Sequence, residues 1–205
     1  MLLTSRKAVL GKCIDLENEI RGLFKVFGIK LPSRVSHNAF DAEVRDVIEA
    51  DRIFSYALLP LLDARLALYQ TFRELDKRTR DLAQEDPICQ RLMSAPGVGF
   101  VTALTFKAAV DDPRRAKQSR TVAAHFGLTP RRLQSGEMDI EGHISKSGDA
   151  KVRATLYAAA NVMLTRSSRW SSLKAWGIRL ARVRGYRRAV VAVARKLAVI
   201  LHRMW

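Results

Sequence analysis

Apolar residues return every three or four positions along the start of the chain, and an α-helix brings residues at that spacing onto one face. The pattern stops at Gly28, and Pro32 lies shortly beyond it as a second stop signal. It therefore predicts one long amphipathic helix that must bury its apolar stripe against a partner. The stripe consists of Val9, Cys13, Leu16, Ile20, Leu23 and Phe27.

A second helical pattern runs from about residue 41 to residue 85, with Pro60 as its only strong helix breaker. Two long runs in succession predict a helical hairpin or coiled-coil arm over residues 1–86. A plain helical bundle fits the same pattern. In both cases much apolar surface is left for another domain or another copy of the chain, so we expect a homo-oligomer.

The rest of the chain is interrupted more often, which predicts shorter helices. Residues 126–149 are rich in glycine and polar residues and predict a loop with at most a short hairpin. The predicted fold is therefore mainly all-α, with the helical arm followed by a compact helical domain over residues 87–205. Its helices are expected at about 100–110, from Asp111 or Asp112 as a cap to about 125, and at 150–166, 170–183 and 186–204.

The turn Pro96-Gly97-Val98-Gly99 separates two of the expected helices. It indicates a helix-hairpin-helix motif at about residues 90–110, in which glycines let backbone N–H groups at a helix start approach a phosphate. Gly97, Val98 and Gly99 are thus candidate nucleic-acid-binding residues. A purely structural corner is the alternative, because a positive φ requirement alone would explain the glycines.

The positive charge lies in the second half of the chain. Residues 1–112 hold 16 Lys or Arg and 16 Asp or Glu, whereas residues 113–205 hold 20 and four. Such an excess repels itself unless a polyanion screens it, and nucleic acid is the polyanion that we expect. The arginines are spread over several segments without one amphipathic face, which disfavours a membrane surface. A solvated basic surface is the plain alternative.

Nothing in the sequence predicts a membrane span or a signal peptide, because no apolar run reaches about 18 residues and the N-terminus carries charges. We therefore expect a cytoplasmic protein. Cys13 and Cys89 stand far apart and outside any metal-ligand spacing. We interpret both as buried thiols and expect no metal site in the chain.

The polar loop holds the residues best suited to chemistry on a phosphodiester. Ser135, Ser145 and Ser147 are possible nucleophiles. Nearby cations would neutralise the non-bridging oxygens of the phosphate and stabilise the transition state. An ordinary Ser-Gly turn is the structural alternative. The cations close in sequence are Arg131, Arg132, Lys146, Lys151 and Arg153.

Several motifs together resemble the C-terminal transposase domain of the insertion sequence one-ten family, which includes the Piv and MooV invertases and recombinases guided by a bridge RNA. The resemblance extends back to RGLFKVFGI at residues 21–29 and covers nearly the whole chain. The motifs, in chain order, are PGVGFVTAL at 96–104, DDP with a following Arg and Ser at 111–119, FGLTPRRLQSGE at 126–137, GHISKSGD at 142–149, the Arg, Leu and Ala-Ala pattern of 153–159, and ARKLAVILHRMW at 194–205.

The resemblance implies a DNA recombinase in which a serine of this domain becomes joined to a DNA phosphate. The serine of the Gln-Ser-Gly motif falls on Ser135, with Ser145 as the alternative nucleophile. The family also has an acidic ribonuclease-H-type domain before the helical region. We find no counterpart of it, so the chain is expected to be a truncated or incomplete transposase without a cofactor of its own. Mg²⁺ is expected only with the acidic domain.

The resemblance implies the ends and target of an insertion sequence as DNA partners, and it leaves a guide RNA open as a second partner. Three functions fit the residues. The first is a transposase whose acidic groups come from elsewhere. The second is a non-catalytic helix-hairpin-helix module that binds nucleic acid. The third is a helical oligomerisation protein whose charge is incidental. His125 and His143 are the nearest candidates for a general base.

Overall fold

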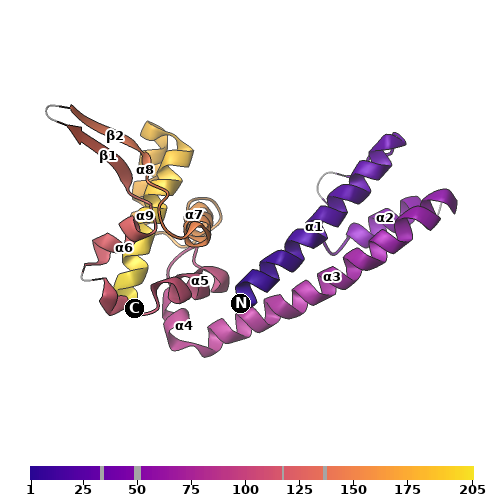
Figure 1. Cartoon of the computed structure of the whole chain (residues 1–205), viewed down its shortest axis with the longest axis horizontal. Helices are drawn as coiled ribbons and strands as arrows, with labels where there is room; N and C mark the ends of the chain where they lie inside the picture. Colours follow the sequence, from indigo (N-terminus) through magenta and orange to yellow (C-terminus); the bar gives the residue numbers. More distant parts are fainter. Residues whose placement is uncertain (33–34, 49–51, 117, 136–137) are drawn as a thin grey trace. The chain divides into compact units, whose positions relative to one another are not determined.

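The computed structural model describes residues 1–32, 35–48, 52–116, 118–135 and 138–205, with the backbone alone described for 132–135 and 138–141. These residues form two compact units, Met1–Thr79 and Arg80–Trp205. Among them, Figure 1 shows helices in both units and one pair of strands. The prediction of a mainly all-α fold is confirmed.

The described part of the N-terminal unit is built from long helices whose apolar faces meet. Figure 1 shows α1 and α3 running alongside each other in opposite directions, with α2 beside α3. Of the predicted stripe of the first helix, Cys13 and Ile20 are buried, whereas Leu23 and Phe27 are exposed. Phe24, which the stripe did not include, is buried in their place, and Ile20 and Phe24 pack in one cluster with residues of the other two helices such as Val44 and Leu62. The helices are α1 (Leu2–Val26), α2 (Phe40–Ile48) and α3 (Arg52–Glu85), the last of which continues into the second unit.

Arg65 of α3 lies fully buried between these helices and joins them through ion pairs. Its Nε donates to Glu17 Oε1 of α1 at 2.9 Å, and its Nη1 donates to Asp41 Oδ2 of α2 at 3.0 Å. His37 accepts from Arg65 through its backbone oxygen and contacts Glu17 Oε1 through its ring Nδ1 at 2.7 Å. Burial alone would raise the pKa of the Glu17 carboxyl, but the hydrogen bonds from His37 and Arg65 hold that pKa below its usual value.

Pro60 was expected to break the second helical run, and this expectation is wrong. The residue lies inside α3, which continues for 25 further residues, from Leu61 to Glu85. A proline removes one helical hydrogen bond because it has no N–H, and the carbonyl left without a partner is that of Tyr56. Both Pro60 and Tyr56 are exposed, so water can satisfy this carbonyl.

The C-terminal unit begins at Arg80 with the end of α3. Its remaining elements are α4 (Pro87–Met93), α5 (Phe100–Val110), the 3-10 turn η1 (Pro113–Arg115), α6 (Ser119–His125), β1 (Pro130–Ser135), β2 (Met138–Ile144), α7 (Ala150–Thr165), α8 (Ser172–Arg184) and α9 (Tyr186–Met204). Four of its helices, α5, α7, α8 and α9, follow the predicted bounds within about two residues, whereas the helix expected from Asp111 or Asp112 begins only at Ser119, as α6.

Aspartate side chains cap the N-termini of several of these helical elements. Asp86 Oδ1 accepts from the N–H groups of Ile88 and Cys89 at the start of α4, at 2.9 and 3.1 Å. Its other oxygen pairs with Lys107 of α5, and this ion pair and the capping bonds lower the pKa of Asp86. Asp112 was expected as a possible cap of the helix that follows, but it caps η1.

Helix α9 is the central element of the unit and packs against α6, α7 and α8 (Figure 1). One face is apolar and buried, whereas Arg187, Arg188, Arg195 and Lys196 are exposed elsewhere on it. No helix in the described ranges is both long enough and apolar enough to cross a membrane. The buried face of α9 consists of Ala189, Val190, Val193, Ala194, Leu197, Ala198 and Leu201.

The polar loop contains the short hairpin that its sequence allowed. Strands β1 and β2 pair antiparallel, with Ser135 opposite Met138 and an irregularity between Pro130 and Arg132. Figure 1 shows the hairpin extending away from the helices of its own unit. Its two ends lead back to α6 and α7, so the residues at its base lie on the helical core.

We predict that Arg65→Leu lowers the free energy of unfolding by about 3–5 kcal/mol, because it leaves the carboxylates of Glu17 and Asp41 without their buried cation. Urea unfolding followed by circular dichroism measures this. Arg45→Leu is the matched control, since Arg45 pairs with Asp63 at 3.2 Å on the surface and should contribute at most about 1 kcal/mol. Equal effects of the two variants would contradict the assignment.

Candidate nucleic-acid interface

The turn between α4 and α5 lies directly on α7, and Gly97 is the residue that permits this contact. Its φ is +81°, and a Cβ at this position would lie 2.4 Å from Ala159 O and 2.9 Å from Met163 N. Any side chain would therefore both strain the backbone and collide with the backbone of α7. Gly97 has a structural role in packing, which the sequence alone could not separate from a role in binding.

Gly99 differs from Gly97 in every one of these respects. It stands before the first residue of α5 with an extended φ of −100° and offers no side-chain cap. A Cβ there would meet nothing within 4 Å. The start of α5 is therefore open on this side, which is the arrangement that the phosphate-binding hypothesis for Gly97, Val98 and Gly99 requires at Gly99.

At the base of the hairpin, the turn formed by residues 145–148 interlocks with the end of α6. Gly127 has a φ of +66°, and a Cβ there would lie 2.2 Å from Ser147 O. Gly148 has a φ of +75°, and a Cβ there would lie 2.1 Å from His125 O. The two backbone segments thus approach each other as closely as glycine allows. This contact fixes the position of Ser145, Lys146 and Ser147.

Arg153 of α7 holds the same turn from the other side. Its Nη1 lies 3.2 Å from Phe126 O, 2.8 Å from Ser147 O and 3.1 Å from Gly148 O. These contacts direct the guanidinium at carbonyl oxygens of the protein. The sequence predicted a phosphate ligand at this position, and the structure gives Arg153 a positioning role in the turn.

The hydroxyls of two serines of the turn lie within hydrogen-bonding distance, and one predicted cation, Arg131, contacts the backbone of the first. Ser145 Oγ lies 2.9 Å from Ser147 Oγ. Arg131 donates from Nη2 to Ser145 O at 3.2 Å. Lys146 is exposed, and its backbone φ is 56°. Residues other than glycine seldom adopt a positive φ, so the surrounding structure holds the backbone in this conformation. Lys151 is also exposed, in the first turn of α7.

The preferred nucleophile, Ser135, is the last residue of β1, and its backbone pairs with Met138. Its side chain and that of Arg132 lie outside the described residues. The choice between Ser135 and Ser145 therefore stays a prediction. His143, one of the candidate bases, is exposed in β2.

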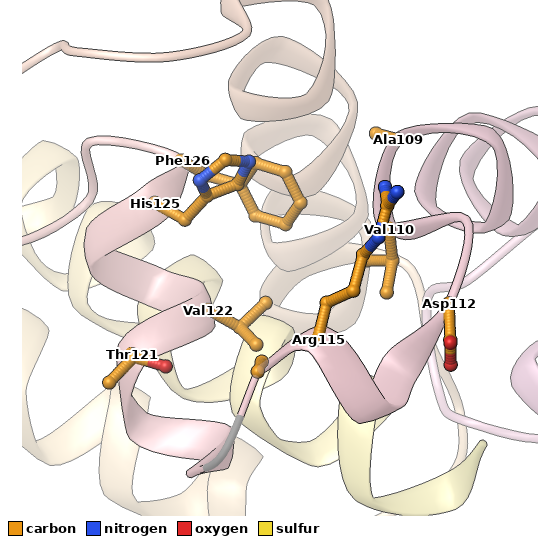
Figure 2. A pocket seen from close by; sticks show the side chains of 9 residues that line it. Ala109, Val110, Asp112, Arg115, Thr121, Val122, His125 and Phe126 are labelled. Atoms are coloured by element: carbon orange, nitrogen blue, oxygen red, sulfur yellow. The ribbon is translucent and has the colours of Figure 1, made fainter.

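A hollow lies where α5, η1 and α6 meet. The sequence did not predict it. Its cavity volume is about 350 Å³. Figure 2 shows Arg115 extending from η1 toward Ala109 and Val110, with the rings of His125 and Phe126 to the left of it. Arg115 is paired with Asp111 at 3.5 Å, so the cation at this hollow already has a partner.

Three potential metal ligands lie together among the described residues, and they belong to the N-terminal unit. Ligand atoms of Cys13, Glu17 and His37 lie within 4.8 Å of one another. The Glu17 carboxylate is already bound by Arg65, whose positive charge opposes a cation at the same oxygen. The buried cysteine fits the interpretation as a packed thiol, and burial raises its pKa.

Comparison with known proteins finds a matching family and several similar transposases. Residues 89–175 match the transposase IS116/IS110/IS902 family. The chain is 31% identical, over 98% of its length, to the transposase for insertion sequence element IS1111A of Coxiella burnetii, of which it covers 56%. It is 32% identical, again over 98% of its length, to the putative transposase y4pF/y4sB of Sinorhizobium fredii, of which it covers 52%. A probable family 20 transposase of Pseudomonas aeruginosa is 28% identical over 90% of this chain.

The resemblance that the motifs implied is confirmed, because the family model matches residues 89–175 and insertion-sequence transposases match along nearly the whole chain. It spans about half the length of the relatives named above. The matched region, 89–175, contains the glycine turn, the hairpin with Ser135, the turn with Ser145 at its base and helix α7.

We predict opposite outcomes for alanine at the two glycines of the turn. Gly97→Ala should lower the free energy of unfolding by about 2 kcal/mol or more, because of its positive φ and its contact with α7. Gly99→Ala should change it by less than about 0.5 kcal/mol, because the site is open and the backbone extended. Thermal unfolding of both variants tests this. Similar losses at the two positions would contradict the packing described here.

Proposed function

We propose that the chain is a DNA-binding part of an insertion-sequence transposase and that its C-terminal unit contacts the DNA backbone. The observation that carries the proposal is the unbalanced charge of that unit. Between residues 113 and 205, Asp149 is the one acidic side chain that the structure describes, and it caps α7 through bonds to the N–H groups of Lys151 and Val152. A surface of this kind is expected to recruit a polyanion.

The hairpin base supports contact with phosphates. The exposed residues Arg131 and Lys146 flank the serine pair, and the interlocked turns hold them in place before any ligand arrives. Fixed cations lose little conformational entropy on binding, which favours affinity. Such contacts depend on the backbone and carry little sequence information. We therefore expect target choice to come from another source, and a guide RNA is the source that the family resemblance suggests.

For strand exchange we propose Ser135 as the nucleophile, with Ser145 as the alternative. In this step the serine Oγ forms an ester bond to phosphorus, and the bond from phosphorus to one deoxyribose oxygen breaks. A base takes the serine proton, and the departing oxygen becomes a hydroxyl. The chain's own cations would hold the non-bridging oxygens during the attack.

A serine hydroxyl needs activation, and the described carboxylates of the C-terminal unit offer little for it. Asp86, Asp112 and Asp149 each cap a helical segment. We propose that Mg²⁺ is held by an acidic domain other than the regions described here, and that it lowers the pKa of the attacking group when bound. The chain by itself should then bind DNA and cleave little.

A non-catalytic binding module is the second candidate. It is favoured by the role of Arg153, whose guanidinium is directed at protein carbonyls and away from a substrate.

Self-association and a cytoplasmic location stay predictions. Exposed apolar side chains on the N-terminal unit, among them Ile53 and Tyr56, support self-association.

We predict that the full chain binds duplex DNA with an affinity that falls steeply with salt. Each phosphate contact should contribute about −0.9 to the slope of log K against log salt concentration. Fluorescence anisotropy over a series of potassium chloride concentrations measures the slope. Arg131→Gln/Lys146→Gln should reduce its magnitude by up to about two. Arg73→Gln/Lys77→Gln removes the same charge from exposed positions of α3 and should leave it unchanged. Absence of binding at low salt would contradict the proposal.

A covalent adduct separates the two candidate functions. We predict that the full chain, Mg²⁺ and a radiolabelled insertion-sequence end give no adduct until an acidic domain is supplied as a separate polypeptide. Denaturing gels detect the labelled protein. Ser135→Ala should then abolish the adduct and Ser145→Ala should preserve it. An adduct formed by the chain alone would contradict the dependence, and the reverse result for the serines would move the nucleophile to Ser145.

A further inference from the structure

A groove runs along the start of α5, and parts of the C-terminal unit that are distant in sequence form its walls. The turn Pro96–Gly99 and Thr102 form one wall, and the end of α7 with residues 166–169 forms the other. The cavity volume is about 650 Å³. Among the described residues that line it, none is acidic.

The groove exposes the first turn of α5. The N–H groups of such a turn have no acceptor within the helix, and the partial positive charge of a helix start adds to them. In α4 and α7 an aspartate accepts these bonds, whereas Gly99 provides no side chain to do so at α5. An anion in the groove could take the place of the missing cap.

Thr102 supplies a separate indication of a ligand. Thr102 is only 8% exposed, and it lines the groove. None of the hydrogen bonds among the described residues involves its hydroxyl. Threonines elsewhere in the helices behave differently, since Thr79 donates to Leu75 O and Thr155 donates to Lys151 O. Most of the Thr102 residue is buried, but its hydroxyl is not among the buried atoms that lack a partner, so it is accessible to a ligand in the groove and can donate to it.

Two arginines complete the opposite rim. Arg166 and Arg169 both line the groove and are exposed. Arg169 lies with Nη1 3.5 Å from Ser94 O, so its side chain reaches across toward the turn after α4. Ala158 and Val162 of α7 add an apolar surface between the two polar rims.

We propose that this groove binds one backbone phosphate of DNA, with the Thr102 hydroxyl and the first N–H groups of α5 on one side and Arg166 and Arg169 on the other. The apolar floor formed by Ala158 and Val162 suits the adjoining deoxyribose. None of the described lining residues is an aromatic one on which a base could stack, which favours contact with the backbone over contact with bases. The inference rests on the proposed function, because it names further residues of the same DNA-binding surface.

Binding of a labelled duplex by the full chain tests the groove. Thr102→Val keeps the shape and the backbone N–H but removes the hydroxyl, and we expect it to weaken binding about tenfold. Thr102→Ser should restore most of the affinity. Arg166→Gln/Arg169→Gln should reduce the magnitude of the salt slope by about one, as expected for loss of one phosphate contact. Thermal unfolding confirms that each variant is folded.

The control is again Arg73→Gln/Lys77→Gln, which removes two charges from the N-terminal unit. If the wild type binds DNA but both groove variants bind as it does, the groove is wrong while the proposed function stands. If the control loses as much as Arg166→Gln/Arg169→Gln, net charge alone explains the effect and the groove is again wrong. If the wild type binds no DNA, the proposed function fails first. If the groove variants weaken binding of single-stranded RNA only, the ligand is RNA and the assignment to DNA is overturned.

Discussion

Two close contacts between backbone segments determine where the polar groups of the C-terminal unit lie. At one, Gly97 lets the turn after α4 rest on α7. At the other, the turns at Gly127 and Gly148 interlock, and Arg153 ties the second of them to α7. Helix α7 takes part in both contacts. It therefore holds the groove near its C-terminal end and the serine turn at its N-terminal end in fixed positions relative to each other.

The C-terminal unit is basic because residues 113–205 hold 20 Lys or Arg and only four Asp or Glu. Asp86, Asp112 and Asp149 are placed at the beginnings of helical segments, where they accept backbone N–H bonds. Only one of them, Asp86, also neutralises a cation of another helix, Lys107. The arginines of α8 and α9 are exposed and form no ion pair with any described residue. The groove at the start of α5, where no side chain caps the helix, belongs to this positively charged unit.

Periodicity and local punctuation predicted most helices, because each depends on residues close together in sequence. Pro60 was misjudged because its cost depends on whether water reaches the carbonyl of Tyr56, which no local pattern reveals. Arg65 in the middle of α3 looks like any surface arginine, since its partners Glu17 and Asp41 lie on other helices. The role of Gly97 likewise depends on Ala159 of α7, a contact between distant parts of the chain.

The candidate site was predicted in part for the same reason. Composition located the positive charge, and the family motifs pointed to the serine turn. Thr102 went unnoticed, because in sequence it is one polar residue within an apolar helix, and its unpartnered hydroxyl is a property of the folded structure. Arg166 and Arg169 follow α7 by a few residues, and only the fold brings them to the start of α5.

The central claim is that the C-terminal unit meets DNA phosphates at positions fixed by the backbone contacts around α7. Amide hydrogen exchange of the full chain, with and without duplex DNA, tests it residue by residue. The account predicts slower exchange on DNA binding at the start of α5, around Val101 and Thr102, and at the turn 145–149, with residues 2–26 of α1 unchanged. Protection confined to the N-terminal unit, or none at these two places in a chain saturated with DNA, would contradict it.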